Sequence, residues 1–411
     1  MKTVTVPNLL WYGNEPRTLE FPDHWEVSLL QPPGFARPAL DQAGIDQALA
    51  SPVGSPPLEE LAAGASEVAI LFDDITRPTP VSRLLPPILG PLHAAGIPRE
   101  NIRLIPALGM HGAMNNIDFR KKLGDEVVRD YAIFNHNPYE NCEKVGVSPS
   151  GIPIELNREF MACDLKIGIG CITPHVHVGF GGGGKIIMPG IASYETIKAF
   201  HLEVPARDYS TLGLGKIEGN VMHAEVVDVC RMSGLRFKAD ALINDRGEIT
   251  DVFAGDPVEA HKAGVAAARE HYGTPASAGN DIVVVNAYAK YNEMAICMMM
   301  ALACVNFAPA GTVVLIVDAP EGQVCHYLLN RFGKEYGGAA YIPRGEPPGG
   351  INGIVCTAYP SATMCDWFAS AESVMVTDDW SATLPLLEER YPGGATVAVI
   401  PDGTMQYFKE A

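Results

Sequence analysis

Short apolar runs alternate with amphipathic stretches along the chain, as expected for strands that alternate with helices. Val68–Phe72 predicts a buried strand, Val81–Ala95 has helical spacing, and Ile102–Pro106 predicts the next strand. A helix that joins two strands in this way implies a parallel pair. The same patterns predict further strands at Thr3–Val6, Trp25–Leu30 and Leu165–Gly170, and further helices at Ser193–His201, Val226–Met232 and Val258–His271.

The segment Gly273–Asn280 is small, polar and contains proline and glycine, so it is the best candidate for a linker. A second series follows, with strands predicted at 281–286, 312–318, 353–357, 373–377 and 396–400 and helices at 292–305, 323–332, 362–370 and 382–391. At 411 residues the chain is too long for one ordinary core. We therefore expect two α/β domains with mainly parallel sheets and an active-site cleft between them. We assign 1–274 to a cofactor-binding domain and 281–401 to a second domain, and expect the tail at 402–411 to pack on the first.

The composition, 47% hydrophobic and 19% charged, is that of a soluble globular protein. The net charge of −18 disfavours nucleic acid and anionic membranes as partners, and it means that an anionic substrate requires local positive groups. Nine cysteines without a C-x-x-C pair favour reduced thiols, and the first residues lack the apolar region of a signal peptide. The longest apolar stretch, Ala295–Val317, is broken by Asn306, Pro309 and Gly311, which disfavours a membrane span. The sequence predicts a cytoplasmic protein and leaves its oligomeric state open.

Three polar clusters, at 73–80, 109–112 and 173–185, follow predicted strands. Ligands of open α/β sheets bind beyond the carboxyl ends of the strands, so this common position indicates a site. In the first cluster Asp73 and Asp74 precede Thr76, Arg77 and Thr79. The two hydroxyls and the start of a helix can cradle a phosphate or carboxylate, and the guanidinium can clamp a carboxylate. The alternative is an ordinary helix start with aspartate caps.

In the second cluster His111 lies between glycines, a position that suits proton transfer, although an idle solvated histidine has the same appearance. The third cluster begins at His175 and leads through four glycines to Lys185, with His201 sixteen residues later. A lysine there can hold a phosphate or form a covalent bond. The spacing matches no zinc motif, Walker loop or dinucleotide fingerprint, and a merely flexible glycine loop is the alternative.

Together, the motifs D-x-x-T-R-P-T-P, G-x-H-G, I-x-P-H and G-G-x-K-x-x-x-P-G, with the later histidine, resemble the lactate racemase family in order and spacing over most of 65–270. Asp251–Asp256 also resembles that family, and the second domain resembles it in layout. The resemblance implies a nickel-pincer nucleotide, a pyridinium mononucleotide with thioamide and thiocarboxylate groups, made by dedicated biosynthetic enzymes. It implies a covalent bond of this cofactor to Lys185, with His201 as nickel ligand.

The same resemblance implies that His111 and His175 are the acid–base pair, one for each enantiomer, and that Asp74 and Arg77 lie near substrate and cofactor. The remaining cofactor-binding residues that we expect are Asp73, Thr76, Thr79, Gly182, Gly183 and Pro189. The reaction implied is racemisation of a small-molecule 2-hydroxy acid by reversible hydride transfer.

The chain departs from the family in the segment 286–299. Family members that act on lactate carry a glutamine and a lysine that reach the substrate, and these positions become Ile296 and Met299 here. Lys290 or Asn292 can substitute from another backbone position, and Trp367 is placed at a family active-site tryptophan. The loss of a cation favours a larger or more apolar acid than lactate. We therefore predict a 2-hydroxy acid racemase or epimerase; the alternative is a cofactor-binding protein or a redox enzyme without racemase activity.

Overall fold

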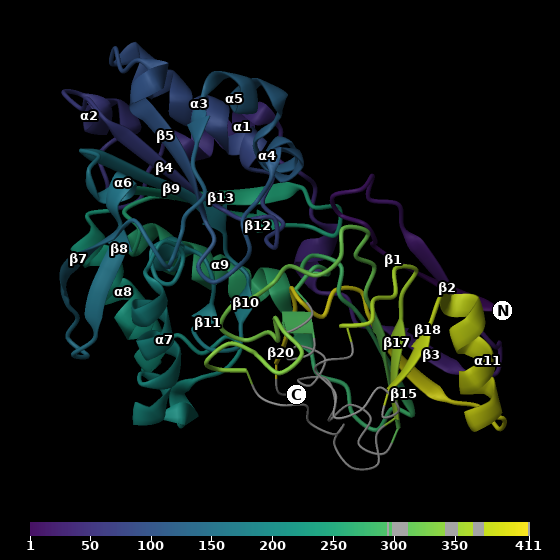
Figure 1. Cartoon of the computed structure of the whole chain (residues 1–411). Coiled ribbons are helices and arrows are strands. Elements are labelled where there is room, and N and C mark those ends of the chain that lie inside the picture. Colours follow the sequence, from purple (N-terminus) through teal and green to yellow (C-terminus); the bar gives the residue numbers. More distant parts are fainter. Residues whose placement is uncertain (294–295, 298–310, 342–351, 365–373, 410–411) are drawn as a thin grey trace. The chain divides into compact units, whose positions relative to one another are not determined.

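The computed structural model describes the chain except for residues 294–295, 298–310, 342–351, 365–373 and 410–411 (Figure 1). It divides into two compact units. The larger unit comprises Ala36–His271 and His326–Leu328, and the smaller unit comprises Met1–Phe35, Tyr272–Cys325 and Leu329–Ala411. Within the described residues, no helix is both long enough and apolar enough to cross a membrane.

The larger unit is built on a six-stranded sheet of order β13-β12-β9-β4-β5-β6. Its strands are β4 (Val68–Asp73), β5 (Ile102–Ala107), β6 (Ala132–Ile133), β9 (Leu165–Cys171), β12 (Phe237–Ile243) and β13 (Ile249–Gly255). All neighbours are parallel except β12 and β13. Every residue of β4 is buried, as its apolar run requires. The predicted parallel α/β sheet is confirmed.

Helices cover this sheet, with α1 (Gln42–Leu49) and α3 (Val81–Ala94) on one side and α8 (Val221–Ser233) and α9 (Glu259–Tyr272) on the other (Figure 1). The remaining helices of this unit are α2 (Leu58–Ala62), α4 (Asn116–Leu123), α5 (Asp125–Asp130), α6 (Arg158–Met161) and α7 (Tyr194–Leu202). Ser193 caps α7 by accepting the amide hydrogen of Thr196, as predicted from its position. Two short hairpins, β7 (Cys142–Val147) with β8 (Pro153–Asn157) and β10 (Pro174–His175) with β11 (Gly179–Phe180), complete the unit.

The smaller unit contains a second six-stranded sheet, of order β18-β17-β16-β15-β19-β3, in which all neighbours are parallel. Its strands are β3 (Glu26–Leu29), β15 (Ile282–Asn286), β16 (Thr312–Ile316), β17 (Asn352–Cys356), β18 (Val374–Thr377) and β19 (Thr396–Ile400). Helix α11 (Trp380–Arg390) follows β18. The five predicted strands and the helix at 382–391 are therefore confirmed.

The N-terminal segment differs from the expected division, because Met1–Phe35 belongs to the smaller unit. Strand β3 pairs with β19, and β1 (Lys2–Val6) pairs with β2 (Arg17–Phe21), whose buried side chains pack against the second sheet. The tail strand β20 (Tyr407–Lys409) pairs with β14 (Gly273–Pro275), so the tail also lies in the smaller unit. Pairing partners this far apart in sequence leave no local signal.

The helix predicted at 323–332 is wrong. This segment has no helix, because Tyr327 donates its amide hydrogen to Met110 of the larger unit's sheet edge rather than to a preceding turn. His326 and Arg331 form isolated bridges instead. Most of the helices predicted at 292–305 and 362–370, together with Met299 and Trp367, lie outside the described residues.

Candidate functional site

The first two polar clusters lie at neighbouring strand ends of the larger unit. Asp73 is the last residue of β4 and pairs in register with Ala107, the last residue of β5. The chain then turns at Leu108 and Gly109 and reaches His111. Gly109 has a φ of +56° and donates its amide hydrogen to Gly190 at 2.8 Å, so the loop of His111 is bonded to the loop that follows Lys185. All three predicted clusters therefore share this edge of the sheet.

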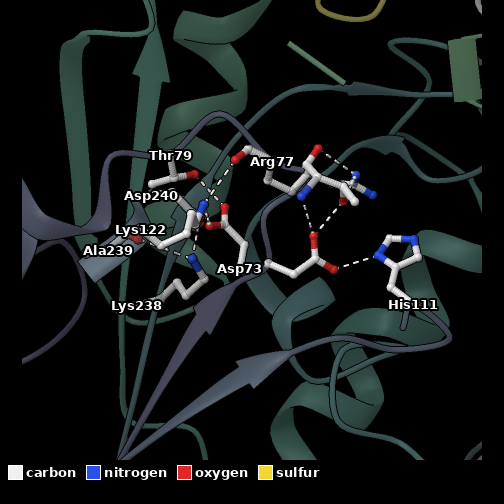
Figure 2. Close-up of polar contacts among 10 residues, drawn as sticks. Asp73, Arg77, Thr79, His111, Lys122, Lys238, Ala239 and Asp240 are labelled. Carbon is white, nitrogen blue, oxygen red and sulfur yellow. Dashed lines mark hydrogen bonds and ion pairs between the residues drawn. The ribbon is translucent and has the colours of Figure 1, made fainter. Parts of the chain in front are cut away.

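Asp74 and His111 form a buried pair (Figure 2). The Nδ1 of His111 lies 2.6 Å from Oδ2 of Asp74. Burial alone would raise the pKa of Asp74, but the imidazole of His111, the guanidinium of Arg77 and the hydrogen bond from Thr76 outweigh it and lower the pKa to about 2. An ionised Asp74 fixes the hydrogen of His111 on Nδ1, which leaves Nε2 as the proton acceptor.

Thr76 and Arg77 organise the other side of this carboxylate. The amide and hydroxyl of Thr76 both donate to Oδ1 of Asp74, at 2.8 and 2.5 Å. Arg77 in turn donates to the hydroxyl oxygen of Thr76 at 2.7 Å. Thr79 donates to Oδ2 of Asp73 at 2.5 Å. Both threonine hydroxyl hydrogens are thus used by carboxylates of the protein, whereas the sequence predicted that they bind the cofactor.

A cluster of two lysines and two aspartates lies beneath these strand ends (Figure 2). Lys122, from α4, is fully buried and lies 2.6 Å from Oδ1 of Asp73. Lys238 and Asp240, both on β12 and 1% exposed, form a second ion pair. Buried charges require partners of this kind, because an unpaired one costs several kcal/mol. Gly170 makes room for the cluster, since a Cβ there would lie 3.1 Å from Nζ of Lys238.

The glycine run is held by this cluster. Oδ2 of Asp240 accepts the amide hydrogen of Gly183 at 2.7 Å, and Nε2 of His261 lies 2.9 Å from the carbonyl oxygen of Gly181. Gly183 has a φ of +52°, and a Cβ there would lie 2.6 Å from Cγ of His261. Close approach and positive φ both require glycine. The run is therefore a packed loop of defined conformation, which contradicts the alternative of a merely flexible one.

Lys185 and His175 are brought together by this loop. Nζ of Lys185 lies 2.7 Å from Nε2 of His175, and Nδ1 of His175 accepts the amide hydrogen of His177 at 3.1 Å. The contact joins the lysine nitrogen directly to an imidazole nitrogen, so a proton can pass between the two side chains. An uncharged amine is the form of lysine that attacks an electrophile.

His201 lies in the last turn of α7, where its Nδ1 is 2.8 Å from the carbonyl oxygen of Ile197. Burial, followed by the nearby His177, lowers the pKa of His201 to about 3. The side chain is therefore neutral, with its hydrogen on Nδ1 and a lone pair on Nε2. This is the form in which histidine binds a metal, and a backbone carbonyl on the other nitrogen is a common orienting partner. The rings of His177 and His201 lie 6.0 Å apart between centroids.

Several residues at this edge of the sheet were not predicted from the sequence as site residues: Lys122, Lys238, Asp240, His261 and His326. A buried lysine on an amphipathic helix looks like a surface lysine until its partner is known, so no signal marked Lys122. Lys238 and Asp240 alternate on one face of an apolar strand, and two charges in such a strand are the signal that could have identified them.

The altered segment 286–299 begins after β15 in the smaller unit. Lys290 and Asn292 are 2% and 1% exposed, and Ile296 is also buried. Tyr291 donates its hydroxyl hydrogen to Glu321 at 2.9 Å. Burial raises the pKa of Asp402 to about 6, although Thr404 and Lys290 act in the opposite direction. The described part of this segment therefore buries a lysine and an asparagine as well as Ile296.

Two parallel α/β units, one with a histidine- and lysine-bearing strand edge, define the fold class of this chain, and the comparisons place it in a family. The family model of the lactate racemase N-terminal domain matches residues 12–213. The lactate racemase of Lactiplantibacillus plantarum is 30% identical over 288 residues, 69% of this chain and 67% of that protein. The lactate racemase of Thermoanaerobacterium thermosaccharolyticum is 29% identical over 269 residues, 64% and 62% of the two chains. The chain belongs to the lactate racemase family.

Solved structures show the same fold. The lactate racemase apoprotein of Thermoanaerobacterium thermosaccharolyticum matches with a TM-score of 0.76 at 22% identity, over 99% of this chain and 100% of that chain. A protein of Thermotoga maritima matches with a TM-score of 0.69 at 19% identity, over 91% and 99% of the two chains.

Proposed function

We propose that this chain is a racemase or epimerase that inverts a 2-hydroxy acid with the help of a nickel-pincer nucleotide, and that lactate is not its main substrate. The observation that carries the proposal is the arrangement of His111, His175, Lys185 and His201 in one unit of a lactate racemase family member. Asp74 holds His111 in the tautomer that its proposed role requires, and burial keeps His201 neutral.

The residues present fit the cofactor. Lys185 contacts His175, an imidazole that can take up the lysine proton, which suits a covalent thioamide bond. His201 is neutral with a lone pair on Nε2, which suits nickel. When bound, the cofactor supplies an acceptor for the hydride of the substrate Cα. Gly182, Gly183 and Pro189 surround Lys185 in the loop, and Asp73, Thr76 and Thr79 remain predicted contacts.

The histidines move the hydroxyl proton. His111 accepts it at Nε2 for one enantiomer, and the ionised Asp74 stabilises the resulting imidazolium. His175 serves the other enantiomer from the opposite loop, once Lys185 is engaged by the cofactor. Arg77 binds the substrate carboxylate, which supplies the local positive charge that a chain of net charge −18 needs. The flat keto acid can then be reduced on either face.

The altered segment 286–299 supports a substrate other than lactate. Ile296 takes the place of the family glutamine by sequence position, and its side chain is buried. Pockets lined by apolar residues favour larger or more apolar acids. The partners that follow from this proposal are the small-molecule acid and the enzymes that make the cofactor.

A protein that only stores the cofactor is the alternative, and the buried Asp74–His111 pair disfavours it. Cofactor binding by itself needs no ionised carboxylate behind an imidazole, and burying that carboxylate costs free energy.

The test is coexpression with the cofactor-making enzymes, followed by intact-mass spectrometry and a panel of chiral 2-hydroxy acids assayed for loss of optical rotation. We expect an adduct that Lys185→Ala abolishes and Lys216→Ala, at a surface position, retains. We also expect at least one acid of the panel to racemise with retention of deuterium at Cα. Absence of the adduct under conditions that load the lactate racemase of Lactiplantibacillus plantarum would refute the cofactor assignment.

A further inference from the structure

A third imidazole lies beside the proposed base. The three residues His326–Leu328 belong to the larger unit, although the residues on both sides of them belong to the smaller one. His326 forms an antiparallel bridge with His111, and the next residue, Tyr327, donates its amide hydrogen to Met110 at 2.8 Å. The backbone of the base-bearing loop therefore fixes the position of His326.

The side chains of this segment are held as well. Leu328 is fully buried, and the ring of Tyr327 packs edge to face on Tyr139, with centroids 6.0 Å apart. The rings of His111 and His326 are 5.0 Å apart between centroids at an interplanar angle of 74°. One ring nitrogen of His111 and one ring nitrogen of His326 lie within 4.8 Å of each other.

The tautomer of His326 follows from its backbone contact. Its Nδ1 accepts the amide hydrogen of Leu328 at 3.3 Å, so the neutral imidazole carries its hydrogen on Nε2 and is a hydrogen-bond donor. His111 is the opposite tautomer, because Asp74 holds its hydrogen on Nδ1. His111 therefore offers a hydrogen-bond acceptor and the neighbouring His326 offers a donor.

This pairing suits a 2-hydroxy acid. The hydroxyl and carboxylate groups of such an acid are on adjacent carbons, so two imidazole rings whose centroids lie 5.0 Å apart can engage both groups of one molecule. We infer that His326 is a substrate-binding residue that donates its Nε2 hydrogen to the carboxylate while His111 accepts the hydroxyl proton. His326 thereby compensates for the family lysine whose position is occupied by Met299. The inference rests on the proposed function.

The experiment measures binding of glycolate, the smallest 2-hydroxy acid, to the cofactor-loaded protein by titration calorimetry. His326→Leu removes the donor, whereas His326→Gln keeps an N–H donor. We expect His326→Leu to weaken glycolate binding roughly 10- to 100-fold, as for loss of a hydrogen bond to a charged group. His326→Gln stays within about threefold of the parent, as does the control His24→Gln at an exposed histidine.

Thermal unfolding and the mass of the Lys185 adduct are measured on each variant. An unchanged glycolate affinity in His326→Leu overturns the inference, as does an equal loss in His326→Leu and His326→Gln. A fall in kcat with unchanged affinity would make His326 a proton relay and would also overturn it. Failure of the proposed function is distinguishable, because it appears in the parent protein as a missing adduct or as absent racemisation.

Discussion

Replacing Asp74 by asparagine is the sharpest probe of the proposed chemistry. Burial alone would raise the pKa of Asp74, so a pKa lowered from 3.8 to about 2 means that the partners of the carboxylate favour its ionised form by about 2–3 kcal/mol net. The imidazole of His111 contributes most to this stabilisation, and it is the group that becomes an imidazolium during proton transfer. The amide of asparagine can donate to Nδ1 and move the histidine hydrogen to Nε2, which removes the proton acceptor.

We expect Asp74→Asn to lower kcat roughly 10²- to 10⁴-fold, because both the charge and the correct tautomer are lost. The assay follows racemisation in both directions across pH, with the Lys185 adduct measured on the same sample. Asp125→Asn is the matched control, since Asp125 is exposed and pairs with Arg120 on the surface. If Asp74→Asn carries the adduct and keeps the parent's kcat and pH profile, the assignment of His111 as an Asp74-oriented base is refuted.

Three further outcomes are expected. His201→Ala should keep the Lys185 adduct but lose nickel, measured by mass spectrometry and metal analysis; full nickel retention would contradict its role as ligand. Gly183→Ala should lower the free energy of unfolding by about 1–3 kcal/mol, because its Cβ would meet His261 and its φ is positive. Urea unfolding tests this against Gly393→Ala, at an exposed glycine where a Cβ would meet no atom within 4 Å. Acid should destabilise the protein between about pH 6.5 and 4. Burial lowers the pKa of His136 to about 4, so the stability from its neutral form is complete above 6.5 and lost as pH falls; a flat unfolding profile over that window contradicts this.

Local pattern was enough to predict most of the two sheets. Strand β4 is an apolar run up to its last residue, Asp73, and every one of its residues is buried, which is the composition that a buried parallel strand requires. The Ser193 cap and α7 were equally predictable, because a cap involves only neighbouring residues. The predicted helix at 323–332 failed because its backbone hydrogen bonds go to a distant loop, which periodicity does not report.

The candidate site was predictable in part for the same reason. Parallel strands bring their carboxyl ends to one edge, so polar residues that follow strands β4, β5 and β9 had to converge. The hydrogen-bond and ion-pair partners of the individual side chains could not be predicted from this rule. Asp73 and Asp74 are adjacent in sequence, but Asp73 pairs with Lys122 and Asp74 with His111. Successive side chains leave a strand in different directions, and the partners they meet depend on strand order and on the helices packed beside them.

The sequence by itself determined the α/β class, the strand ends that carry chemistry and the motifs that mark the lactate racemase family. Only the tertiary structure decided that Met1–Phe35 joins the smaller unit, that Asp240 and His261 hold the lysine loop, and that His326 stands beside His111. The physical reason is the distance along the sequence over which each kind of interaction acts. Burial and capping are set by residues within a few positions, whereas Asp74 and Asp73, the partners of His111 and Lys122, lie 37 and 49 residues away in the sequence.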